Sequence, residues 1–98
     1  MKYGMNLLLW SGSIGPEHYP LLAKLKAAGF DGVEIPVFGG EPADYKPLRA
    51  ELDKNGLKCT TVTILTAETN AVSPDAAVRA SAVDWLKKVV DINHVLGS

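Results

Sequence analysis

The stretch Phe30-Asp-Gly-Val-Glu-Ile-Pro-Val37 predicts a buried β-strand that ends in a turn. β-branched residues alternate along it, and an apolar run this short has the length of a strand rather than of a helix. Glu34 places a carboxylate in the middle of the strand, where burial is costly unless the group is paired, hydrogen-bonded or close to a metal. Pro36 has no N–H for a ladder partner, so the regular strand ends there. Because ligands of parallel α/β folds bind at the carboxyl ends of the strands, Glu34 is the first candidate for a functional residue.

The same order of strand, loop and helix occurs three times in the 98 residues. Each expected helix shows apolar residues at helical spacing and is followed by a glycine that suits a left-handed cap. This alternation predicts an α/β fold with a parallel sheet and right-handed crossovers. The expected strands are residues 3–10, 30–37 and 57–65. The expected helices are residues 16–28, 43–55 and 74–96, the last with Ser73 as its cap and Pro74 at its first position.

Three parallel strands leave two long edges and much sheet face uncovered. A closed (β/α)8 TIM barrel has eight strands and typically about 250 residues. We therefore interpret residues 1–98 as a partial TIM-barrel domain, formed by three consecutive parallel β/α units from the N-terminal portion of such a barrel. The alternative is a self-contained α/β domain of three units.

Composition and charge exclude several classes of function. The formal net charge of −1 gives no electrostatic reason to expect nucleic acid or an anionic membrane as a partner. A single cysteine, Cys59, excludes an intrachain disulfide and suits a reducing compartment. The sequence shows neither a bilayer-spanning apolar stretch nor the pattern of a signal peptide. We therefore expect a cytoplasmic protein.

Three residues of the first two expected strands are candidates for a binding site, each with a structural alternative. Glu34 is expected to hydrogen-bond a polar ligand, or else to be a buried acid that a lysine or a backbone N–H satisfies. Asn6, inside the first expected strand, needs partners if it is buried, and could contact a substrate or hold a neighbouring loop. Trp10, at the end of that strand, could form an apolar wall for a sugar or could belong to the core.

Four segments occur together in one order along the whole chain: Gly4-Met-Asn-Leu-Leu-Leu-Trp10, Gly29-Phe-Asp-Gly-Val-Glu-Ile-Pro36, Gly56-Leu-Lys-Cys59 and Ser73-Pro-Asp75 followed by Val78-Arg79. This ordered set resembles the amino-terminal part of the sugar phosphate isomerase/epimerase superfamily, which has a xylose-isomerase-like barrel. Within that superfamily it is most similar to ketose 3-epimerases of the D-tagatose and D-allulose (psicose) type.

The resemblance implies a metal-dependent isomerase of carbohydrate metabolism that exchanges the C3 proton of a ketose sugar through an enediolate. It implies a divalent metal, Mn2+ or Co2+ and possibly Mg2+, for the full-length parent, with ligands from later strands and none from these residues. The family pattern places Asn6, Trp10, Glu34 and Val62 in the substrate-binding wall and assigns no catalytic residue here. Some epimerases have an aromatic residue at the position of Asn6, so the exact sugar stays open.

The resemblance also leaves other activities open. Hydroxypyruvate isomerase and inosose dehydratase share the scaffold, as does an endonuclease IV-like nuclease, which the near-neutral charge disfavours. A different hypothesis is a non-catalytic α/β module that is stable only on association. For the full-length protein we expect a homo-oligomer.

Overall fold

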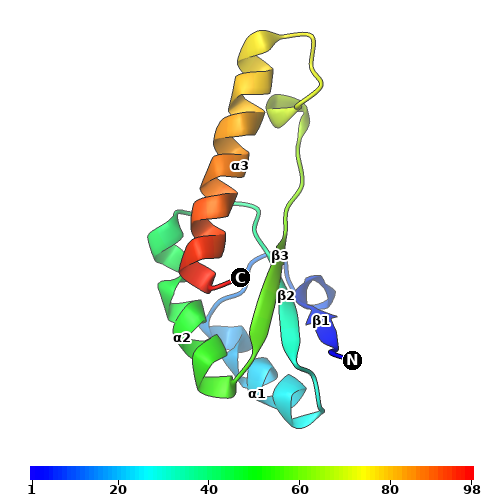
Figure 1. Cartoon of the computed structure of the whole chain (residues 1–98), viewed down its shortest axis with the longest axis vertical. Helices are drawn as coiled ribbons and strands as arrows, with labels where there is room; N and C mark the ends of the chain where they lie inside the picture. The colour runs from blue at the N-terminus through cyan, green and yellow to red at the C-terminus, as the bar shows by residue number, and fades with distance from the viewer.

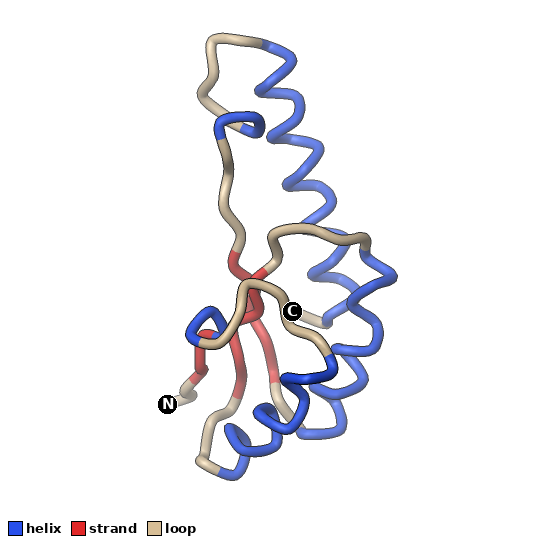
Figure 2. Tube along the Cα trace, turned by 180° about the vertical axis from the view of Figure 1, so that it is seen from behind, coloured by secondary structure: helices blue, strands red, loops and turns tan.

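The computed structural model describes all residues from Met1 to Ser98 and contains one parallel sheet with helices on one side. The strands pair in the order β1-β2-β3, and each neighbouring pair is parallel. The helices gather on one side of the sheet (Figures 1 and 2). The predicted three β/α units are therefore confirmed. The elements are β1 (Gly4–Asn6), α1 (Tyr19–Ala27), β2 (Gly32–Pro36), α2 (Lys46–Asn55), β3 (Lys58–Val62) and α3 (Ala76–Leu96).

The hydrophobic core lies between the sheet and the helices. Val33 and Ile35 of β2 are 2% and 0% exposed, and they belong to one core cluster with the apolar stripes of all three helices. Because side chains alternate along a strand, Glu34 between them points to the opposite face of the sheet. No helix of this chain covers that opposite face (Figure 1). The helix residues of the core are Leu22, Leu25, Leu48, Leu52, Val89, Ile92 and Leu96.

The first strand is shorter than the sequence predicted, and it is not buried on both faces. β1 ends at Asn6, and Leu7–Leu9 form a single turn of 3-10 helix called η1. Asn6 causes this change, because its side-chain oxygen accepts a hydrogen bond from the backbone N–H of Leu8 at 2.8 Å and so caps the turn. Trp10 therefore follows a helical turn instead of ending a strand.

Two helices begin later than the sequence predicted, and a proline near the start of each helix explains the difference. Residues 16–18 and 42–45 form 3-10 turns, and α1 and α2 begin only at Tyr19 and Lys46. Pro20 and Pro47 lie at the second position of these helices. A proline there cannot donate to the carbonyl four residues earlier, so the preceding turn does not continue as α-helix.

The start of α3 was also predicted too early, with Ser73 as its cap. The cap is Asp75, whose Oδ1 accepts a hydrogen bond from the N–H of Ala77 at 2.8 Å. The carbonyls of Ser73 and Pro74 instead accept from the Arg79 guanidinium, at 2.8 and 3.0 Å. A side chain therefore holds the turn that the sequence assigned to the helix.

Residues 63–75 form an arm that projects with the first half of α3 beyond the sheet (Figure 1). β3 ends at Val62, not at residue 65, because Val37 is the last residue of the neighbouring segment that donates to it, with its N–H 2.8 Å from the Val62 carbonyl. The indole N–H of Trp85 donates to the Thr63 hydroxyl at 3.1 Å and joins the base of the arm to α3. This arm extends the molecule to 48 Å in one direction and 25 Å in the others.

Candidate functional site

The open face of the sheet carries one row of polar side chains that crosses all three strands. Asn6 of β1 pairs in register with Glu34 of β2, and Glu34 pairs with Thr60 of β3. Residues in register on parallel strands point to the same side, so this row faces away from the helices. The next residue of β3, Thr61, faces α3 instead, because its hydroxyl donates to the Asn93 side chain at 2.7 Å.

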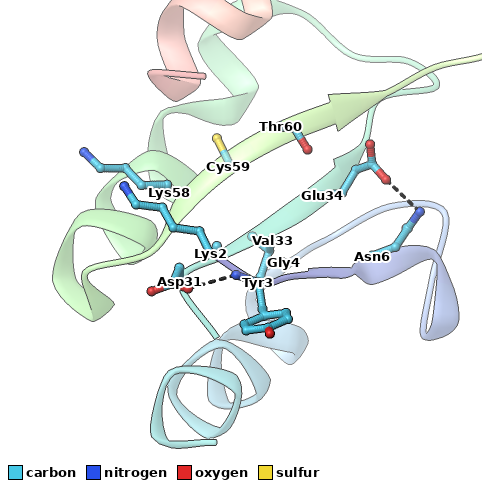
Figure 3. A pocket seen from close by; sticks show the side chains of 11 residues that line it. Lys2, Tyr3, Gly4, Asn6, Asp31, Val33, Glu34, Lys58, Cys59 and Thr60 are labelled. Atoms are coloured by element: carbon cyan, nitrogen blue, oxygen red, sulfur yellow. Dashed lines mark hydrogen bonds between the residues drawn. The ribbon is translucent and has the colours of Figure 1, made fainter. Parts of the chain in front are cut away.

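Asn6 and Glu34 contact each other directly. The Asn6 amide donates to Oε2 of Glu34 at 2.9 Å, and both side chains are half-buried (Figure 3). Glu34 is therefore neither the fully buried acid nor the residue paired with a lysine or a backbone N–H that the sequence suggested. Asn6 has the expected structural role, because it holds the turn after β1. It also lies on the open face of the sheet, and its contact with a substrate stays a prediction.

A shallow pocket of about 320 Å³ follows this face of the sheet. The pair of Asn6 and Glu34 lies at one end, with Thr60 beside it (Figure 3). Lys2 and Lys58 lie at the other end, where the strands begin. Since ligands in this fold bind toward the carboxyl ends, the candidate site is the end that holds the row of Asn6, Glu34 and Thr60.

Val62 and Trp10 lie further toward the carboxyl end than this row. Val62 pairs in register with Pro36, so it lies on the open face two residues beyond Thr60. Trp10 is 46% exposed after η1 and is no part of the buried core. No hydrogen bond joins its side chain to the polar row. Sequence reasoning missed Thr60, although its position two residues before Val62 on an expected strand was a signal for the same face.

The His, Cys, Asp and Glu side chains of this chain do not form a metal centre. No group of three or more His, Cys, Asp or Glu side chains is placed to hold an ion. The Cys59 thiol lies on the helix side, with Sγ 3.7 Å from the Leu96 carbonyl oxygen. Burial raises the pKa of this thiol, with a partly opposing effect from the Arg49 guanidinium, so its neutral form is favoured. These features do not suit a nucleophilic cysteine.

An open parallel sheet, helices on one face and polar residues on the other define an arc of a β/α barrel. A family model described as xylose isomerase-like TIM barrel matches residues 22–98, and the chain belongs to this family. None of its helices combines the length and the hydropathy that a membrane span requires.

Two relatives are ketose epimerases. A ketose 3-epimerase of Arthrobacter globiformis is 30% identical over 99 aligned positions, which cover 100% of this chain and 34% of the relative. A crystal structure of a D-allulose 3-epimerase from Methylomonas sp. in complex with D-allulose superposes with a TM-score of 0.85 at 28% identity, and again covers 100% of this chain and 34% of that one. The chain thus spans about a third of the length of these relatives.

A third comparison supports the fold alone. The structure of a D-psicose 3-epimerase in the presence of D-fructose has a TM-score of 0.80 at 24% identity, over 99% of this chain and 35% of that chain. The expected N-terminal portion of a TIM barrel is therefore confirmed as the fold class.

Proposed function

We propose that this chain forms the first three β/α units of a ketose 3-epimerase and supplies part of the wall of its sugar pocket. The observation that carries the proposal is the 30% identity with a ketose 3-epimerase over 100% of the chain. The open face supports it, because a carboxylate, an amide and a hydroxyl in one row suit a ligand rich in hydroxyl groups.

The reaction proposed is exchange of the proton at C3 of a free ketose through an enediolate. This carbon acid is weak, so it needs a positioned base and an electrophile that stabilises the developing oxyanion. The side chains of these 98 residues do not form a metal site, and we assign none of them to proton transfer. We propose that a divalent ion of the full-length protein is held by residues outside this chain. Asn6, Trp10, Glu34 and Val62 then contribute pocket wall only.

The test is to express the full reading frame and to incubate the purified protein with manganese and individual ketoses in deuterium oxide. Loss of the C3 proton signal of D-fructose, D-tagatose or D-allulose in the NMR spectrum would support the proposal. Activity on hydroxypyruvate or an inosose, without exchange on any ketose, would assign the protein to another branch of the family. The matched blank is the same protein after chelation and dialysis.

One observation favours association for the 98 residues when they are studied alone. Val83, Leu86 and Val90 lie on one side of α3 and are 49%, 40% and 64% exposed. Their spacing of three and four residues makes a continuous apolar stripe. We propose that the isolated segment self-associates through such uncovered surface, and that the full-length protein forms a homo-oligomer. Light scattering of both proteins tests this, and a well-folded monomer of the segment at low concentration would contradict it.

A further inference from the structure

The amide of Asn6 is held on both sides, which fixes its orientation. Its Oδ1 accepts a hydrogen bond from the N–H of Leu8 at 2.8 Å, and its Nδ2 donates to Oε2 of Glu34 at 2.9 Å. A flipped amide would turn its NH2 group toward the Leu8 donor and its oxygen toward the carboxylate, and would lose both bonds. The main-chain turn of η1 therefore determines which group Asn6 presents to Glu34.

The second oxygen of the Glu34 carboxylate has no partner in the protein. Oε2 accepts a hydrogen bond from Asn6, whereas Oε1 makes neither a hydrogen bond nor an ion pair. Oε1 is not among buried polar atoms that lack a partner, because the structure has none. Thr60, the next residue of the polar row, also has a hydroxyl without a protein partner. Lys2 and Lys58 line the opposite end of the pocket and are directed away from the carboxylate (Figure 3).

We propose that Asn6 is a positioning residue that holds one Glu34 oxygen, so that the other accepts a hydrogen bond from a hydroxyl group of the ketose. This inference rests on the proposed function and deepens it, because it gives the two residues different roles. Glu34 contacts the sugar, and Asn6 acts on the sugar only through Glu34. A carboxylate oxygen is an acceptor only, so the ligand group must be a donor, as a sugar hydroxyl is.

The arrangement can be tested by exchanging the two functional groups. In Glu34→Gln, the Asn6 amide still donates to the new side-chain oxygen, which turns the Gln NH2 toward the pocket and replaces an acceptor by a donor. In the double variant Asn6→Asp with Glu34→Gln, the Asp keeps an oxygen for Leu8 and accepts from the Gln NH2. The Gln oxygen then faces the pocket again. The double variant should therefore bind the sugar better than Glu34→Gln does.

Steady-state kinetics of the full-length protein give the first readout. We expect Glu34→Gln to raise KM for the ketose roughly 10- to 100-fold, the usual effect of losing a hydrogen bond to a charged group, with a much smaller change in kcat. The double variant should recover a large part of this loss. Asn70→Asp is the matched control for the Asn6→Asp change and should leave KM unchanged. Asn70 also accepts a hydrogen bond from the N–H two residues on, that of Val72 at 3.0 Å, but it has no carboxylate partner.

Side-chain NMR gives a second readout that does not depend on turnover. With isotope-labelled asparagine, the Asn6 NH2 signals should move in Glu34→Gln, and D-allulose should shift them in the parent protein but not in Glu34→Gln. Recovery of KM in the double variant together with these shifts supports the inference. An active parent whose KM is unchanged in Glu34→Gln, or a double variant that is as impaired as Glu34→Gln, overturns it. A parent without C3 exchange sinks the proposed function instead, and absence of the NMR response to D-allulose then sinks the inference as well.

Discussion

The substitution Ile35→Ala tests the alternation on which the site depends. Ile35 follows Glu34 in β2, is 0% exposed and belongs to the core cluster. The change removes three buried carbon atoms, which at about 0.8 kcal/mol each corresponds to about 2.4 kcal/mol of transfer free energy. The cavity that remains adds to this loss, so we expect the free energy of unfolding to fall by about 3–4 kcal/mol.

Urea unfolding followed by far-UV circular dichroism measures this loss, provided that the slope with denaturant stays unchanged. Ile64→Ala is the matched control, because Ile64 lies on the arm and is 60% exposed. Its free energy of unfolding should change by no more than about 0.5 kcal/mol. A one-residue slip of β2 would move Ile35 to the open face and Glu34 into the core. Equal effects of the two substitutions would therefore refute both the register and the site built on it.

Three further changes probe other features by stability or reactivity. Gly32→Ala places a Cβ 2.7 Å from the Lys58 carbonyl oxygen, so it should lower the free energy of unfolding by about 1–3 kcal/mol in a urea titration. In the control Gly39→Ala, the new Cβ meets no atom within 4 Å, so the free energy of unfolding should not fall. Asp75→Ala should cost about 1 kcal/mol by the same titration and Asp75→Asn almost nothing, because only alanine lacks a capping oxygen; equal losses would contradict the cap. Since burial raises the pKa of the Cys59 thiol, its folded-state thiolate is depleted, and Ellman's reagent should react more slowly with the folded than with the urea-unfolded protein near neutral pH. The stability that this thiol contributes is present below its unfolded pKa and is lost as the pH rises through the higher folded value. Above the folded pKa the thiol is ionised in both states, so the difference in reaction rate between folded and unfolded protein should narrow in alkaline solution.

The architecture was predictable because the strong signals in this sequence are periodic. The alternating residues of β2 and the closing glycines mark units that hydrophobic burial then assembles. Gly56, for example, adopts a left-handed φ of +66° at the end of α2, as its position predicted. The boundaries of the elements were harder to predict, because single side-chain hydrogen bonds determine them. The cap that Asn6 provides to η1 and the bonds of Arg79 before α3 are not visible in a hydrophobic pattern.

The candidate site was predictable in its members but not in its geometry. Glu34 stood out as a charge within an apolar strand, and Asn6 as an amide within another. Only the register of β1 and β2 places them side by side, and register follows from the packing of the whole sheet. Thr60 does not stand out by residue type, because threonine is common in strands on any face, and only its spacing of two from Val62 indicates the face. Roles in substrate binding for Asn6, Trp10, Glu34 and Val62 stay predictions.

The separation of the two faces of the sheet has a consequence for protein engineering. In β2 and β3, the positions that stabilise the fold and the positions that face the pocket alternate one by one along the same segments. Codons for Glu34, Thr60 and Val62 can therefore be randomised together while Val33 and Ile35 are kept. Libraries built in this way should retain a high fraction of folded members, so selection for a new sugar can act on recognition without repeated compensation for lost stability.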